Sequence, residues 1–287
     1  MGFSNNWRSN KVPKGFSLHI GLNSVDPQHY SGWSGDLVAC ESDAEDMGLI
    51  AKSLRYDNTS TLLTTNATID NFVNEVKKAA SSLESGDIFF LSYSGHGGRV
   101  PDQQNDEADG FDETWCLYDG QFLDDEIHAL WHLFKEDVRI VVLSDSCHSG
   151  SITKAQHYAL YNFSNIDPVK HVAYRYMPLG IRTKTFEKNR SIYHERKAQV
   201  NERNDNELKC SVKLISGCQD NQLSADGAFN GLFTATLLSV WRSGAFEGNY
   251  QKFHRKILEA MPPDQSPNLL DIGKSNPTFD NQKPFVI

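Results

Sequence analysis

Two glycine-containing segments of the chain carry side chains that can act together on a carbonyl group. Cys147 lies in the segment 144–150, Ser-Asp-Ser-Cys-His-Ser-Gly, and His96 lies in the segment 94–98, Ser-Gly-His-Gly-Gly. A thiol attacks a carbonyl as its thiolate, so it needs a nearby base, and an imidazole is such a base near neutral pH. The pair predicts nucleophilic catalysis, with Cys147 as nucleophile and His96 as base. A buried cysteine taken alone is more often a small core residue.

Two further features of these segments bear on the chemistry. His148 adjoins Cys147, but neighbouring side chains of extended backbone point to opposite sides, so we expect His96 to be the base. A tetrahedral intermediate needs donors for its oxyanion, and the backbone N–H groups of Gly97 and Cys147 are the candidates. The alternative for Gly97 is an ordinary turn residue.

Strongly apolar runs, residues 87–93 and 138–143, precede the two segments. Apolar strands that alternate with amphipathic helices predict a parallel sheet covered on both faces. Ligands of such sheets bind beyond the carboxyl ends of the strands, so both reactive side chains are expected at one edge. The other predicted strands are 16–22, 61–63 and 212–215, and the predicted helices are 40–54, 69–83, 231–240 and 250–261.

Composition excludes several classes of protein. Hydrophobic residues make up 39% of the 287, enough for a globular core, and the net charge of -9 disfavours nucleic-acid binding while it suits a basic substrate. The five cysteines form no CxxC pair, which indicates free thiols in a reducing compartment. A metal or redox protein is therefore a weak alternative. No signal peptide or membrane span is evident, so we expect a cytoplasmic protein without a membrane partner.

The motifs resemble those of a known family. Tyr93-Ser-Gly-His-Gly97 and the segment 145–150 resemble the two catalytic motifs of metacaspases, the caspase-like cysteine peptidases of clan CD and peptidase family C14. The histidine precedes the cysteine by about 50 residues, as in the caspase signature. The segments 37–43 and 215–226 resemble the family's motif after the first strand and its small-subunit motif.

The resemblance implies an α/β fold, a caspase-like three-layer α/β/α sandwich with a mainly parallel central sheet. It implies a short N-terminal arm, residues 1–15, and one peptidase domain, residues 16–287. Within that domain, 16–154 is large-subunit-like, 155–209 is a linker or insertion of loosened pattern, and 210–287 is small-subunit-like. A monomer is expected, because metacaspases are typically monomers.

The resemblance also implies a function. The expected enzyme is a thiol protease, a cysteine-type endopeptidase that hydrolyses peptide bonds after Arg or Lys through a Cys-His dyad and an acyl-enzyme. The positions that match its acidic pocket are Asp43 and Asp145, with Ser94 as a polar wall, and carboxylates hold such cations well. From its position alone, Asp43 is an exposed acid in the first turn of a helix. The alternative function is a non-catalytic caspase-like signalling or binding module, although the chain keeps both nucleophile and base.

Acidic residues gather between positions 102 and 126. Many metacaspases are activated by calcium at four aspartates, of which three match Asp112, Asp124 and Asp125. The fourth falls near Lys154, which would repel the ion or substitute for its charge. The run that begins at Asn105 partly mimics an EF-hand loop, but its twelfth position is Cys116 and not Glu, so an EF-hand is rejected. The chemistry needs no cofactor, and the sequence leaves open calcium activation or a solvated acidic loop.

Nine basic residues lie between positions 170 and 203. An enzyme that cuts after Arg or Lys would be able to process its own linker, whereas the alternative is an ordinary solvated surface or helix face. The sequence does not choose between them, nor does it identify the activating signal or the physiological substrate. The candidate processing sites are Arg182, Lys184, Lys188, Arg190, Arg196 and Lys197.

Overall fold

A six-stranded sheet forms the centre of the computed structural model, which describes residues 12–101, 110–147, 174–201, 207–218, 226–227, 229–263 and 265–287. The strand order is β2-β1-β3-β7-β8-β9, and all neighbours are parallel except β9, which runs antiparallel to β8. The strands are β1 (Gly15–Gly21), β2 (Asn58–Leu63), β3 (Ile88–Ser94), β7 (Arg139–Asp145), β8 (Ser211–Ser216) and β9 (Asn268–Gly273).

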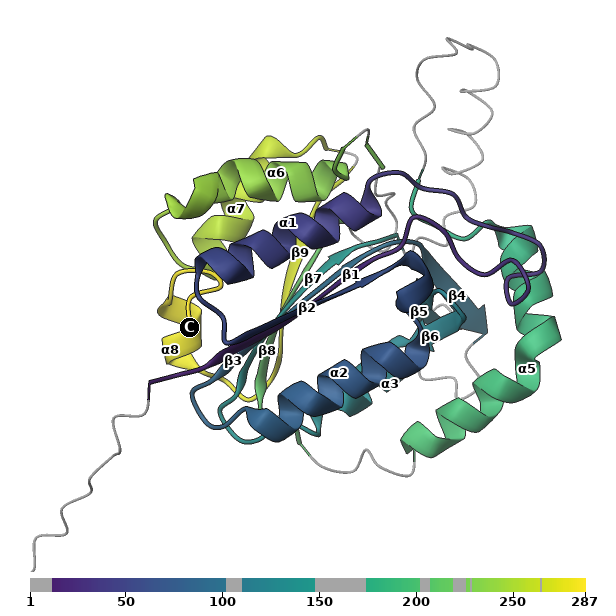
Figure 1. Ribbon diagram of the computed structural model, residues 1–287, viewed down its shortest axis with the longest axis horizontal. Coiled ribbons are helices and arrows are strands. Elements are labelled where there is room, and N and C mark those ends of the chain that lie inside the picture. Colours follow the sequence, from purple (N-terminus) through teal and green to yellow (C-terminus); the bar gives the residue numbers. More distant parts are fainter. Residues whose placement is uncertain are drawn as a thin grey trace, which may run out of the picture.

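Helices cover both faces of this sheet (Figure 1). One face packs against α1 (Cys40–Ser53), α6 (Leu232–Trp241) and α7 (Tyr250–Ala260), and the other packs against α2 (Ile69–Ser82) and α3 (Asp124–Trp131). The predicted three-layer α/β/α sandwich with a mainly parallel sheet is therefore confirmed. Among the helices within the described ranges, none combines the length and apolar character that crossing a bilayer requires.

Strand β3 explains why the sequence before His96 is almost continuously apolar. Every residue of β3 is buried. Ile88 and Phe90 enter the core with α1, α6 and α7, while Phe89 and Leu91 enter the core with α2 and α3. Successive side chains of a strand point to opposite faces, so a strand covered on both sides is apolar at every position.

The pairing of β3 with β7 fixes where the two reactive segments begin. In their parallel register, Ser94 lies opposite Asp145. Each strand ends at that pair, so the segments with His96 and Cys147 leave the sheet at the same edge. The sequence predicted this arrangement from the apolar runs alone.

A second, antiparallel sheet of three strands, β4-β5-β6, follows His96 and was not predicted. It extends the molecule beyond the carboxyl edge of the main sheet (Figure 1). Its strands are β4 (Gly97–Pro101), β5 (Phe111–Leu117) and β6 (Gly120–Leu123), and the remaining elements are the short helix α8 (Pro277–Asn281) and the 3-10 turns η1 (Thr64–Asn66) and η2 (Arg242–Gly244).

The segment 155–209, expected as a linker or insertion of loosened pattern, contains a long helix in its second half. Residues Leu179–Asn201 form the long helix α5, which has non-helical dihedral angles at Asn189. Only a few apolar side chains, Phe186 and Tyr193 among them, pack against Val100 and Leu123 of the small sheet. The helix is otherwise polar around its circumference, so it lacks the apolar stripe from which an amphipathic helix is predicted.

Candidate active site

His96 is held by its backbone and by one side of its ring. The Tyr93 hydroxyl and the Cys116 amide both donate to the His96 carbonyl, at 2.7 and 2.9 Å. The ring lies 4.6 Å from the Trp33 ring, centroid to centroid, and its Nε2 lies 2.8 Å from the Gly35 carbonyl oxygen. A carbonyl only accepts, so Nε2 carries the proton and Nδ1 carries the lone pair.

The environment of this imidazole favours the neutral form. Burial lowers the pKa of His96 to about 4, although the hydrogen bond to the Gly35 carbonyl opposes the change. Nδ1 has no hydrogen-bond partner among the described residues. The predicted base is therefore neutral at physiological pH and presents an available lone pair.

Cys147 follows β7 directly and is buried. A second thiol, Cys218, lies beside it. The hydrogen bond to Cys147 is the main cause that raises the pKa of Cys218, and burial is the next. The Cys218 thiol also donates to the Ser146 carbonyl at 3.3 Å. No role was predicted for Cys218, although it lies inside the segment that resembles the small-subunit motif.

The two predicted oxyanion donors converge on one atom. The backbone N–H groups of Gly97 and Cys147 both donate to the carbonyl oxygen of Arg175, each at 3.0 Å. Donors of an oxyanion hole lie at such distances from the oxygen that they stabilise. The segments of His96 and Cys147 thus meet around the carbonyl group of a third segment.

The side chain of the same Arg175 fills the predicted acidic pocket. It is fully buried, and its guanidinium lies 2.7 Å from Asp43, 2.8 Å from Asp145 and 2.8 Å from the Ser94 hydroxyl oxygen. Asp43 is 1% exposed, so the alternative of an exposed helix acid is wrong. The structure therefore brings together all three residues predicted for this pocket.

Several pocket residues escaped prediction. Asp226 binds the Arg175 guanidinium at 2.9 Å, and its other oxygen accepts the Val38 amide, also at 2.9 Å. Thr234 donates to Asp145, and the Gly231 amide donates to Asp43. Asp226 ends the segment that resembles the small-subunit motif, which was the one available indication of its role. Arg175 was counted among the nine basic residues but was not singled out.

Burial and neighbouring charges act against one another in this pocket. Burial raises the pKa of Asp43 to about 6; Arg175 opposes this shift and Asp145 adds to it. Burial by itself lowers the pKa of Arg175, but the surrounding carboxylates, led by Asp145, reverse the shift and raise it well above its ordinary value. The pocket is built for a cation and holds one.

The three carboxylates expected to bind calcium do not form a cage. Both oxygens of Asp112 bind the ammonium of Lys197, and burial, followed by the nearby Asp125, raises the pKa of Asp124 to about 7. Across the described ranges, no three side chains of His, Cys, Asp or Glu are arranged to hold a metal ion. Lys154, His148 and residues 102–109 lie outside the described residues.

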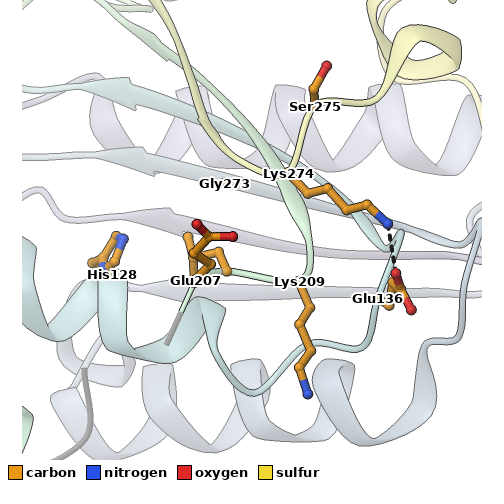
Figure 2. A pocket seen from close by; sticks show the side chains of 8 residues that line it. His128, Glu136, Glu207, Lys209, Gly273, Lys274 and Ser275 are labelled. Atoms are coloured by element: carbon orange, nitrogen blue, oxygen red, sulfur yellow. Dashed lines mark hydrogen bonds and ion pairs between the residues drawn. The ribbon is translucent and has the colours of Figure 1, made fainter. Parts of the chain in front are cut away.

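A separate hollow of about 740 Å³ lies at the other edge of the sheet, where β8 begins and β9 ends (Figure 2). Lys209, Lys274 and Glu136 are among its lining residues, and Lys274 pairs with Glu136 at 2.7 Å. The carboxyl ends of the parallel strands, with Cys147 and His96, are at the opposite edge. Its size therefore does not make it the candidate active site.

Comparisons with known proteins agree with the motifs. The family model described as Caspase domain (Peptidase_C14) matches residues 25–285. Metacaspase-1 of Schizosaccharomyces pombe is 29% identical over 79% of this chain and 58% of its own length, and Metacaspase-1 of Pyricularia oryzae is 25% identical over 85% and 67%. The crystal structure of protein GSU0716 from Geobacter sulfurreducens is 49% identical, with a TM-score of 0.85 over 96% of this chain and 99% of that chain. The chain spans about three fifths of the length of the first curated relatives that it matches.

The tautomer and pKa of His96 are open to direct measurement by nitrogen-15 NMR on the Cys147→Ala chain. We expect an Nε2-protonated neutral ring with no titration between pH 5 and 8, because burial disfavours the imidazolium. A His96→Gln spectrum assigns the signal. A midpoint near 6.5, or a proton on Nδ1, contradicts the arrangement described above.

Proposed function

The chain belongs to the caspase-domain family of peptidases, and from this premise we propose that it is a cysteine endopeptidase that cleaves after Arg and Lys. One observation carries the proposal. Arg175 has its side chain among three carboxylates and its carbonyl oxygen on two N–H groups at the same time. A substrate residue on the amino side of a scissile bond needs both contacts.

The proposed mechanism assigns each catalytic step to one of the groups described above. Nδ1 of His96 takes the proton of the Cys147 thiol, and Sγ attacks the carbonyl carbon. The negative charge passes to the carbonyl oxygen, where the N–H groups of Gly97 and Cys147 stabilise it. The C–N bond breaks, and the proton on His96 goes to the leaving amine. Water then hydrolyses the thioester and regenerates the thiol.

The pocket favours arginine over lysine. The guanidinium is planar and presents several N–H donors, and in Arg175 its two terminal nitrogens bind different partners. A lysine ammonium is a single point charge and contacts fewer of the three carboxylates at once. We therefore place arginine first among substrates and lysine second.

The bond in the cleft belongs to the chain itself. Tyr176 follows Arg175 and bridges to Gly97 in parallel, and the Met177 amide donates to the Gly97 carbonyl at 2.9 Å. The backbone N–H of Tyr176, which would become the leaving amine if this bond is cut, donates to the Tyr174 carbonyl at 2.9 Å. We place the self-processing site at Arg175–Tyr176. The candidates expected earlier, from Arg182 to Lys197, all lie inside helix α5 and not in the cleft.

Substitution of either reactive side chain tests the activity. Cys147→Ala and His96→Ala are each expected to lower kcat for arginyl fluorogenic peptides by about 10⁴-fold or more, because nucleophile and base act as a unit. Cys210→Ala, which removes a buried thiol elsewhere, serves as the matched control. A folded wild-type chain that neither hydrolyses these peptides nor reacts with an arginyl chloromethyl ketone would favour a binding module instead.

The pH profile tests the role of Asp43. The raised pKa means that this carboxyl loses its charge as the pH falls through about 6, while His96 stays neutral to about 4. We expect kcat/KM for arginyl peptides to fall as the pH drops below 6. Asp43→Asn should lower kcat/KM by about 10–100-fold at pH 7.5 and should remove this acidic limb of the pH profile. Glu45→Gln, an exposed acid of the same helix, is the control. An unchanged limb in Asp43→Asn refutes the assignment.

Intact-mass spectrometry tests self-processing. The wild-type chain is expected to yield a cut between Arg175 and Tyr176, since that bond has the geometry of a bound substrate. Cys147→Ala and Arg175→Gln should stay whole at this bond, and Arg175→Lys should still be cut, more slowly. Arg190→Gln, in helix α5, is the control. A wild-type chain that stays whole while it hydrolyses arginyl peptides shows that the bond is held but not cleaved.

A further inference from the structure

A lysine occupies the centre of the acidic cluster where the family resemblance places calcium. Nζ of Lys197, in α5, lies 2.7 and 2.6 Å from the two oxygens of Asp112 and 3.7 Å from Asp125. The side chains of Lys197 and Asp112 are 7% and 3% exposed. Charges buried to this degree are stable only when they are paired.

The ammonium blocks the ligand geometry that calcium requires. Calcium takes six to eight oxygen ligands at about 2.3–2.6 Å, and a two-oxygen carboxylate is among its strongest ligands. Asp112 already gives both oxygens to Lys197. Asp124 and Asp125 line a different hollow, of about 370 Å³, which Asp112 does not line. Among the residues that the structure describes, those of the acidic cluster therefore do not fit the ion.

The same contact fastens α5 to the catalytic half of the molecule. Lys197 joins α5 to Asp112 at the start of β5 and to Asp125 in the first turn of α3. The adjacent Arg196 binds Glu126 at 2.8 Å through Nε and donates to the Gln121 carbonyl at 2.9 Å. Helix α5 follows directly on the segment that fills the cleft, and these two side chains fasten the carboxyl-terminal part of that helix to α3 and to the small sheet.

We infer that Lys197 is a built-in replacement for the metal: its ammonium neutralises the cluster and makes fold and activity independent of calcium. A cation tethered to the chain competes at a high effective concentration and never dissociates fully. Calcium would have to displace a buried ammonium before it could reach the two oxygens of Asp112. This role concerns the stability of the fold as well as the proposed peptidase activity.

Thermal unfolding of the full chain in the Cys147→Ala background tests the inference without reference to activity. We expect the parent Tm to be the same within about 1 °C in EGTA and in millimolar calcium, with magnesium as the salt control. Lys197→Met should lower Tm by roughly 5–15 °C, because it leaves buried carboxylates without their cation. Lys197→Arg should retain most of the parent Tm. Lys184→Met, an exposed lysine of the same helix, should change nothing.

A calcium-dependent rise in Tm confined to Lys197→Met supports the replacement directly. A saturable rise in the parent chain overturns the inference, as does a Lys197→Met variant as stable as the parent. In the active chain, arginyl-peptide hydrolysis that EGTA abolishes and calcium restores also overturns it. Hydrolysis absent under all conditions, with the expected Tm pattern, refutes the proposed function and leaves the role of Lys197 intact.

Discussion

The buried cluster of one guanidinium and three carboxylates is the interaction on which the candidate site depends. Asp43, Asp145 and Asp226 come from three distant parts of the chain and lie against one another only because Arg175 neutralises them. Without a cation, burial would drive protons onto these carboxyls, as the raised pKa of Asp43 already indicates. The cluster thus fixes the pocket and holds the chain segment that occupies it.

The main sheet supplies the rigid reference for this cluster. Strands β3 and β7 are buried along their whole length and end in register at Ser94 and Asp145. The segments after these strands carry the imidazole and the thiol, and α1 brings Asp43 to the same edge. Regular secondary structure therefore carries Asp43 and Asp145 and leads directly into the segments of His96 and Cys147. Arg175 and Asp226 lie outside helices and strands and are positioned by the contacts they make in the pocket.

Local pattern in the sequence predicted the parts of the fold that have a strong local cause. Continuous apolar runs identified β3 and β7, and the spacing of apolar residues identified α2, which begins after its N-cap Thr68. Strand β4 was missed because glycine and proline are rare in strands. Arg175 was missed because its partner Asp43 lies 132 positions away, and no local pattern encodes such a contact. The pocket itself was predicted from a family resemblance; the catalytic roles of its neighbours stay predictions.

The occupied cleft has a consequence for any ligand that enters from solution. A reversible inhibitor must find the fraction of molecules in which the tethered arginine has left, so its measured Kd equals the intrinsic value divided by that fraction. Because the competitor is part of the same chain, the strength of this competition does not depend on the protein concentration. Screening against the intact chain will therefore undervalue reversible binders, whereas a covalent reagent that traps each brief opening will accumulate with time.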